Sequence, residues 1–370
     1  RGPAVDGRIL PTVVAPGEDI VSARSTIDSQ PATPGIQPNR PAWTDSGGTV
    51  HNQHTLMSGT SMAAPHVSGA VALLAQRWQE RTGQRPSPAL VKALLVNTAE
   101  DMSGGPNWRA MWPTWTTSGS NFTITGLGFA PTQVVEEVFS TAAYSNLTQV
   151  ANVAAITAGG QWTYNAGTDT LTMRTTTGGR PYGGGVNNVG IWVLDPNPVA
   201  PIPNNDQGWG RVSTDNLLLS SPDSDRGPRL VVDERLGFDA SGQEWNLRVA
   251  PVDPTRPMRI TLAWTDAPGA AGANPALVND LDLEVTEVGT GGIFRGNVFN
   301  NGFSATGGAF DYVRILEGVF VQNPSGVYDV SVIASLLRGN ARPPFGTATT
   351  WQDFALVIAN AEIESDTPID

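Results

Sequence analysis

The sequence predicts a mixed architecture, in which an α/β portion comes first and all-β modules follow, the last of them an antiparallel β-sandwich or jelly roll. Residues 67–74 carry apolar side chains at the spacing of an amphipathic helix. The C-terminal third instead alternates apolar and polar residues over short runs, which is typical of strands with one buried face. The 41 glycines, 29 prolines and only 15% charged residues agree with a chain rich in loops and strands.

The composition excludes several classes of function. The net charge is −12 and the pI is about 4.7, so we expect no nucleic-acid partner. No apolar run is long enough to span a membrane, and no signal peptide opens the sequence, although Arg1 need not be the natural start. Cysteine is absent, which excludes a cysteine nucleophile and a thiolate zinc site.

One serine, Ser61, stands in a setting that suits nucleophilic chemistry. It lies in the stretch Met57–Gly69, at the predicted start of a helix, where unpaired backbone N–H groups favour negative charge. A hydroxyl placed there can attack a carbonyl while its own N–H holds the oxyanion, and the small residues Gly59 and Ala63 leave room for a substrate backbone. The alternative is that Ser61 is only a helix N-cap.

The string Gly-Thr-Ser-Met-Ala-Ala-Pro-His, which contains Ser61, resembles the nucleophile motif of the subtilisin-like serine proteases, the subtilases of peptidase family S8. The resemblance implies that Ser61 is the catalytic nucleophile and forms an acyl-enzyme with a protein or peptide substrate. Ala63 stands where the nucleophile elbow of the α/β-hydrolases has its second glycine, which argues against that class. Val13–Gly17 resembles the strand and turn before the nucleophile helix, so we expect the sequence to begin late in the catalytic domain.

A serine nucleophile also needs a base and a carboxylate that orients the base. Subtilases carry both upstream of the serine, and the segment that holds their histidine is not found here. His66 falls on the same predicted helix as Ser61, and His51 and His54 fall in the preceding loop, so structural or solvated roles are expected for all three. Asp45 begins an Asp-Ser-Gly string but comes too late in the order. We therefore expect the triad Asp and His, with the oxyanion Asn, to lie in a missing N-terminal part of the catalytic domain.

The sequence divides into four segments. Residues 1–104 are predicted to be the C-terminal part of the catalytic domain, with a first helix ending near Arg81 before Gly83 and a second beginning at Ser87-Pro88. Residues 105–203 read as an inserted β-rich module, in which 133–143 is predicted as a short helix. Its tryptophans Trp108, Trp112 and Trp115 are read as buried, with a surface for binding carbohydrate as the alternative. Residues 204–222 resemble the closing segment of the catalytic domain, and residues 223–370 form the β-sandwich.

The β-sandwich segment carries a second resemblance. Leu262–Pro268 and Leu277–Leu283 are similar to the C-terminal β-barrel domain of the oxidatively stable alkaline proteases among the subtilases. Asp266, Asp280 and Asp282 lie within these strings and can supply oxygens to a structural Ca²⁺ ion. A solvated acidic face or a network of hydrogen bonds in a turn is the alternative. No cofactor is expected for catalysis.

Two functions compete at this stage. The first is a secreted serine endopeptidase, inactive as residues 1–370 alone because its base lies elsewhere. The second is a non-catalytic binding or adhesion protein that retains part of a protease domain. The intact stretch Gly59–Gly69 favours the endopeptidase.

Overall fold

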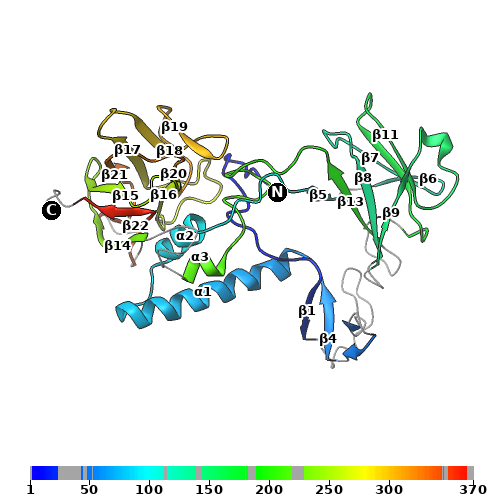
Figure 1. Cartoon of the computed structure of the whole chain (residues 1–370), viewed down its shortest axis with the longest axis horizontal. Coiled ribbons are helices and arrows are strands. Elements are labelled where there is room, and N and C mark those ends of the chain that lie inside the picture. Colours follow the sequence, from blue (N-terminus) through cyan, green and yellow to red (C-terminus); the bar gives the residue numbers. More distant parts are fainter. Residues whose placement is uncertain are drawn as a thin grey trace. The chain divides into compact units, whose positions relative to one another are not determined.

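The computed structural model describes residues 2–23, 43–44, 48–51, 53–111, 115–138, 143–179, 181, 189–218, 229–343, 345 and 349–364. The chain divides into two compact units. The first comprises Arg1–Ala15, Ala64–Ser103 and Ala200–Asp370, and the second comprises Pro16–Ala63 and Gly104–Val199. The described chain is mostly β-sheet with few helices (Figure 1). No helix within these ranges is long and apolar enough to cross a membrane.

Among the described residues, the first two helices lie where the sequence predicts, and a third, short helix was not predicted. They are α1 (Thr60–Thr82), α2 (Pro88–Asn97) and α3 (Thr214–Leu218). Arg81 lies in the last turn of α1, and Gly83 follows with a φ of +72°, the left-handed conformation that glycine adopts without steric cost. Ser87 caps α2, because its Oγ accepts a hydrogen bond from the Leu90 N–H at 3.0 Å. Both predicted boundaries are confirmed.

The C-terminal strands of the first unit form two antiparallel sheets. The four-stranded sheet has the order β14-β22-β16-β20, and the six-stranded sheet has the order β19-β18-β17-β21-β15-β23. These strands are β14 (Arg229–Phe238), β15 (Glu244–Pro251), β16 (Met258–Ala263), β17 (Asp280–Glu287), β18 (Ile293–Asn300), β19 (Phe303–Thr306), β20 (Leu316–Val321), β21 (Tyr328–Leu336), β22 (Gln352–Ala359) and β23 (Ala361–Ile363). The predicted start of this region, residue 223, lies outside the described residues.

A hydrophobic core fills the space between these two sheets. It takes side chains from β16, β20 and β22 of one sheet and from β17 and β21 of the other. Each fully buried aliphatic side chain contributes about 1.5–3 kcal/mol to folding. The apolar positions of the alternating runs in the C-terminal third all belong to this core, namely Ile260, Leu262, Trp264, Leu281, Leu283, Val285, Tyr328, Val330, Val332, Phe354, Leu356 and Ile358.

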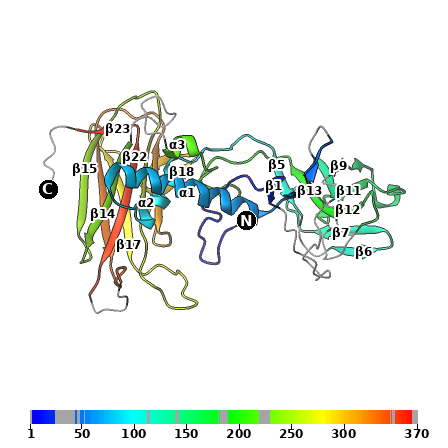
Figure 2. The same ribbon diagram turned by 90° about the horizontal axis from the view of Figure 1, so that it is seen from below.

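The four-stranded sheet is covered on its other face as well. Every residue of β16 and β20 is buried, although an alternating pattern predicts one exposed face. The second face packs against α1 and α2 through an apolar cluster, and in Figure 2 α2 is seen in front of β14 and β22. The cluster includes Ala70, Leu74, Leu90, Ala93 and Leu94 from the helices and Ala263, Leu316, Phe320, Ala355 and Val357 from the sheet. The helices are therefore joined to the sandwich through a second apolar cluster on the outer face of this sheet.

Two buried polar residues join α2 to this sheet. The Asn97 Nδ2 donates to the carbonyls of Arg259 and Val357 at 2.9 and 3.1 Å, and to the Thr261 hydroxyl at 3.1 Å. In return, the Arg259 guanidinium donates to the carbonyls of Asn97 and Ala99. The last carbonyls of a helix have no partner within the helix, so Arg259 supplies donors that α2 itself lacks.

We expect Asn97→Ala to lower the free energy of unfolding by about 2–3 kcal/mol, because it leaves three buried acceptors without their donor. Urea denaturation followed by far-UV circular dichroism measures the change. Gln79→Ala, at an exposed position of α1, is the control and should change stability by less than about 0.5 kcal/mol. Equal effects of the two substitutions would contradict a stabilising role for Asn97.

The second unit contains two larger sheets, one five-stranded and one four-stranded, with their own core. Their orders are β10-β11-β12-β7-β6 and β5-β13-β8-β9. The strands are β5 (Asn107–Ala110), β6 (Thr116–Ser118), β7 (Asn121–Thr125), β8 (Gln133–Val138), β9 (Ala143–Asn146), β10 (Thr148–Gln149), β11 (Gln161–Asn165), β12 (Thr170–Arg174) and β13 (Val189–Asp195), with a 3₁₀ turn at Val153–Ala155. The core between the sheets contains Trp115 and Trp162, which are 3% and 1% exposed. Trp108 is half-buried, and Trp112 lies outside the described residues.

The helix predicted over 133–143 is wrong. Residues Gln133–Val138 form strand β8, which pairs with β13 on one side and β9 on the other. Two glutamates, which favour helices locally, are buried here. Glu136 accepts from the Thr176 N–H at 2.6 Å, and Glu137 accepts from the Trp192 Nε1 at 2.9 Å. Sheet pairing and these hydrogen bonds outweigh the local preference.

Candidate functional site

Ser61 is the second residue of α1, and its side chain is exposed. The chain reaches it through β4 (His54–Met57), which pairs antiparallel with β1 (Ile20–Ala23). The two smaller two-stranded sheets of this region are β1-β4 and the pair β2 (Trp43–Thr44) and β3 (Val50–His51). Ser61 thus stands at the start of a helix, as the sequence predicts, but the segment before it, which was predicted as a loop, contains strand β4.

The backbone around Ser61 is held by a turn at Gly59. The Gly59 N–H donates to the Gly17 carbonyl at 2.6 Å, and the Gly59 carbonyl accepts from the N–H of Met62 at 2.9 Å. A Cβ on Gly17 would lie 2.8 Å from the Gly59 carbonyl oxygen, so no larger residue fits without a backbone shift. The turn that ends at Gly17 and the serine motif are therefore packed against each other.

Pro65 removes one backbone hydrogen bond from the first turns of α1. Proline has no N–H, so the Ser61 carbonyl receives no hydrogen bond from the residue four positions later. The Ser61 hydroxyl makes no hydrogen bond with any residue in the described ranges. The hydroxyl is therefore accessible at the helix N-terminus, where the backbone dipole favours a developing negative charge.

Among the described side chains, neither His54 nor His66 is placed as a base for Ser61. His66 is exposed and lies five residues further along α1, about 140° around the helix axis from Ser61. His54 is exposed on β4, and the side chain of His51 and all of Asp45 lie outside the described part of the structure. No hydrogen bond joins Ser61 to His54 or His66.

A group of polar residues that the sequence did not suggest lies in the same unit. The Ser58 Oγ accepts from the Asp19 N–H at 2.8 Å, and the Tyr144 hydroxyl donates to the Glu18 Oε1 at 3.1 Å. Burial raises the pKa of the Glu137 carboxyl, with the charges of Asp19 and Glu18 acting in the same direction. Because Tyr144 follows Glu18 by more than 100 positions, no local motif could have predicted this contact.

The three aspartates predicted to bind calcium have different surroundings. Asp266 shapes a loop: its Oδ1 accepts from the N–H groups of Ala267 and Asn279, both at 2.8 Å, and its Oδ2 accepts from the Val278 N–H at 2.7 Å. Asp282 is 2% exposed, and its Oδ2 accepts a hydrogen bond from the Ser335 hydroxyl. One oxygen each of Asp280 and Asp282 is buried without a partner.

Glu317, on β20, adds a fourth carboxyl that the sequence did not single out. It is 0% exposed; its Oε2 accepts from the Leu283 N–H at 2.7 Å, while its Oε1 is buried without a partner. Burial raises the pKa of Glu317 well above its ordinary value, and the charges of Asp282, Asp311 and Asp280 raise it further. Burial, with the charge of Asp282, raises the pKa of Asp280 to about 7.

The orphaned carboxyl oxygens of Asp280, Asp282 and Glu317 fit the chemistry of a hard cation, which prefers oxygen ligands. However, the described residues contain no group of three or more His, Asp or Glu side chains arranged to hold a metal ion. The calcium site therefore stays a prediction, and Asp266 already uses both its oxygens on backbone donors.

We expect Glu317→Gln to raise the melting temperature at pH 8 in a buffer with EDTA. A carboxyl with a raised pKa binds more protons in the folded than in the unfolded chain, so it lowers stability as pH rises above about 4.3. Glutamine removes this penalty and keeps an acceptor for the Leu283 N–H. Each kcal/mol corresponds to about 2–4 °C at this size, which differential scanning calorimetry resolves.

A measurement at a second pH and a control variant show whether ionisation of Glu317 causes the gain in melting temperature. The gain should be lost when both proteins are measured near pH 4, where the unaltered Glu317 is protonated in either state. Glu244→Gln, at an exposed position of β15, should leave the melting temperature unchanged at both pH values. A gain that is the same at pH 4 and pH 8 would show that ionisation of Glu317 is not its cause.

Comparison with known proteins assigns a family to the N-terminal part. Residues 1–133 match the model of the subtilase family. The serine protease/ABC transporter B family protein tagD of Dictyostelium discoideum is 26% identical over 340 residues, which cover 86% of this chain and 15% of that protein. Pyrolysin of Pyrococcus furiosus is 39% identical over 106 residues, covering 29% of this chain and 6% of pyrolysin.

Serine protease AprX of Bacillus subtilis is a further relative, 37% identical over 100 residues, which cover 26% of this chain and 18% of AprX. In each of these three relatives the aligned part is less than a fifth of the protein.

Proposed function

We propose that the chain is part of a serine endopeptidase in which Ser61 is the nucleophile, because residues 1–133 match the subtilase family of serine proteases. The observation that carries the proposal is the exposed hydroxyl of Ser61 at the N-terminus of α1, directly after the Gly59 turn. The substrate is a protein or peptide.

The proposed reaction proceeds through an acyl-enzyme. The Ser61 Oγ attacks the scissile carbonyl carbon while a base accepts its proton; the amine then leaves with that proton, and water hydrolyses the ester. The base and the carboxylate that orients it are expected in a segment outside residues 1–370, because subtilases carry both upstream of the serine and the segment that holds their histidine is not found in this sequence. Backbone N–H groups at the start of α1 stabilise the oxyanion.

The proposed domain organisation follows the family relationship. Residues 1–104 and 204–222 belong to an α/β catalytic domain of the subtilisin type, 105–203 are an insertion into it, and 223–370 form a jelly roll. Secretion is part of this proposal. The hydrogen bonds that join residues 12–14 to Trp209, Gly210 and Val212 support placing both ends of the catalytic segment in one domain.

We also propose that a structural calcium ion binds at the acidic residues of the sandwich. Asp280 and Asp282 supply carboxyl oxygens to the ion, whereas Asp266 fixes the loop that precedes them. The ion neutralises carboxylates that otherwise repel one another in a buried setting. The unpartnered oxygens of Asp280 and Asp282 support this proposal.

The nucleophile is tested by peptide cleavage. We expect residues 1–370 alone to leave peptides uncut, because a serine without its base stays protonated. Joined to the proposed triad-bearing segment, the chain should cleave peptides and react with a fluorophosphonate probe. Ser61→Ala should then reduce kcat by about 10⁶-fold, the loss measured for the corresponding change in subtilisin, a member of this family.

Ser58→Ala is the matched control, since it removes a neighbouring hydroxyl that is engaged with Asp19 and should retain most of the activity. Cleavage by residues 1–370 alone that disappears in Ser61→Ala would contradict the proposal that the base lies outside them. Cleavage that survives Ser61→Ala would contradict the nucleophile itself.

The calcium proposal is tested by chelation. EDTA should lower the melting temperature of the chain, and added CaCl₂ should restore it, because a ligand at 1,000 times its Kd stabilises the folded state by about 4 kcal/mol. Asp282→Asn should abolish the response, whereas Asp253→Asn, in an exposed turn, should keep it. An identical melting curve with and without EDTA would contradict the site.

A further inference from the structure

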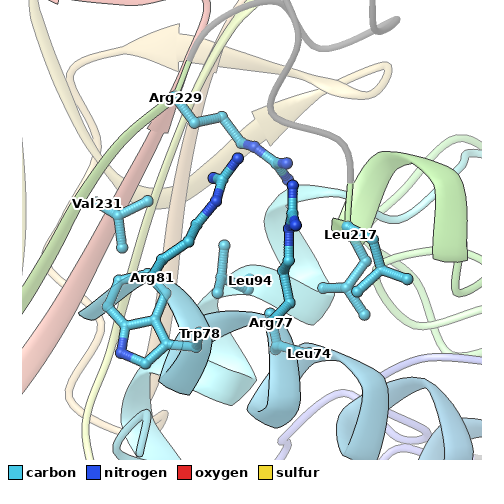
Figure 3. A pocket seen from close by; sticks show the side chains of 9 residues that line it. Leu74, Arg77, Trp78, Arg81, Leu94, Leu217, Arg229 and Val231 are labelled. Carbon is cyan, nitrogen blue, oxygen red and sulfur yellow. The ribbon is translucent and has the colours of Figure 1, made fainter. Parts of the chain in front are cut away.

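Two places outside the nucleophile bring distant segments of the chain together. The first is a pocket of about 110 Å³ among α1, α2, α3 and β14 (Figure 3), where the Nη1 of Arg229 donates to a backbone carbonyl of α3. The second is a set of hydrogen bonds between Tyr144, on β9 of the proposed insertion, and the acidic residues Glu18 and Asp19. This second contact leads to the turn before Ser61.

Tyr144 contacts two consecutive carboxyl groups with one hydroxyl. The hydroxyl donates to the Glu18 Oε1 at 3.1 Å and lies 3.4 Å from both carboxyl oxygens of Asp19. The two acids directly follow Gly17, and they precede Tyr144 by 126 and 125 positions. The fold therefore brings the segment 17–19 against β9, which no local turn could do.

The charges at this contact keep the Tyr144 hydroxyl a donor. Burial raises the pKa of Tyr144, and three neighbouring carboxylates, those of Glu137, Glu18 and Asp19, raise it further, so the phenol stays protonated. Glu137 lies on β8, the strand beside β9, and accepts from the Trp192 Nε1 at 2.9 Å. A hydrogen bond from a neutral hydroxyl to a carboxylate is charge-assisted and stronger than one between neutral groups.

The acidic segment is anchored on both sides to the turn in front of α1. On one side the Gly59 N–H donates to the Gly17 carbonyl at 2.6 Å, and on the other Ile20 pairs with Met57 at the end of β4. Gly17 also packs closely against α1, since a Cβ added there would lie 3.1 Å from the Cβ of Ala63. A shift of the two acidic residues between these anchors is therefore passed to the first turn of α1.

Asp19 has a backbone conformation that needs support from its surroundings. Its φ is +52°, in the left-handed region that residues other than glycine occupy at an energetic cost. Such a conformation persists where surrounding contacts impose it, and the Tyr144 hydroxyl supplies one of these contacts. Removal of that hydroxyl should therefore loosen the segment.

We propose that Tyr144 is a positioning residue for Ser61. Its hydroxyl holds Glu18 and Asp19, and the anchors on either side of these residues fix the direction in which α1 presents the Ser61 Oγ. The role of Ser61 rests on the proposed function, whereas the coupling between β9 and the turn is a property of the chain itself. The alternative is that Tyr144 covers the edge of its own sheet and leaves the turn unaffected.

Hydrogen–deuterium exchange of the 370-residue chain tests the coupling without catalysis. Tyr144→Phe removes the hydroxyl and keeps the ring, so exchange in peptides covering 17–23 and 55–62 should become about three- to tenfold faster. Tyr164→Phe is the matched control and should leave both peptides unchanged, since its hydroxyl donates at 2.6 Å to Asp169, another aspartate with a positive φ, within a hairpin. Unchanged exchange in Tyr144→Phe, or an equal change in both variants, would overturn the coupling.

Catalysis tests the positioning role. In the chain joined to the proposed triad-bearing segment, Tyr144→Phe should lower kcat by about three- to tenfold and change KM by less than about twofold. A misdirected hydroxyl slows attack on the carbonyl but leaves the bound substrate in place. Tyr164→Phe should change neither value. An unchanged kcat in Tyr144→Phe, or a rise in KM alone, would overturn the positioning role.

Paired outcomes separate the positioning role from the proposed function. If the joined chain cleaves peptides through Ser61 while Tyr144→Phe changes neither exchange nor kcat, the positioning role is wrong and Ser61 remains the nucleophile. If Tyr144→Phe speeds exchange but cleavage survives Ser61→Ala, the proposed nucleophile and the role of Tyr144 toward it are wrong, and only the coupling remains.

Discussion

The exchange of hydrogen bonds between Asn97 and Arg259 is the constraint on which the first unit depends. Both side chains are buried. The Asn97 side chain donates to backbone carbonyls of the sheet, and the Arg259 side chain donates to a backbone carbonyl at the end of α2. Arg259 also lies over the ring of Phe320, with 4.3 Å between its Cζ and the ring centroid. A buried cation without such partners would cost several kcal/mol, so the position of α2 and the register of β16 are fixed together.

This arrangement explains why one sheet differs from the other. The four-stranded sheet packs against the opposite sheet on one face and against α1 and α2 on the other, so β16, β20 and β22 are buried on both faces. Strands buried on both faces have nearly continuous apolar sequences. The run Phe354–Ala359 is such a sequence, whereas β21 alternates buried and half-buried residues through Tyr328–Ile333.

The elements that local sequence determines could be predicted, and those that depend on distant contacts could not. The ends of α1 and α2 follow from Gly83, Ser87 and Pro88, which act within a few residues. Strand β8 was predicted as a helix because the burial of Glu136 and Glu137 depends on Thr176 and Trp192, far along the chain. For the same reason the position of Ser61 at the start of a helix could be predicted. The contact of Glu317 with Leu283, on the strand that carries Asp282, could not.

The arginines show how an acidic protein uses a small number of cations. Lys92 is the only lysine in the sequence, and burial lowers its pKa. The Arg259 guanidinium donates to two carbonyls at once, and the Arg248 guanidinium binds both oxygens of Asp329. A planar guanidinium group makes such paired hydrogen bonds better than the ammonium group of a lysine. The guanidinium groups of Arg259 and Arg248 are therefore each satisfied by carbonyls or a carboxylate of the chain itself.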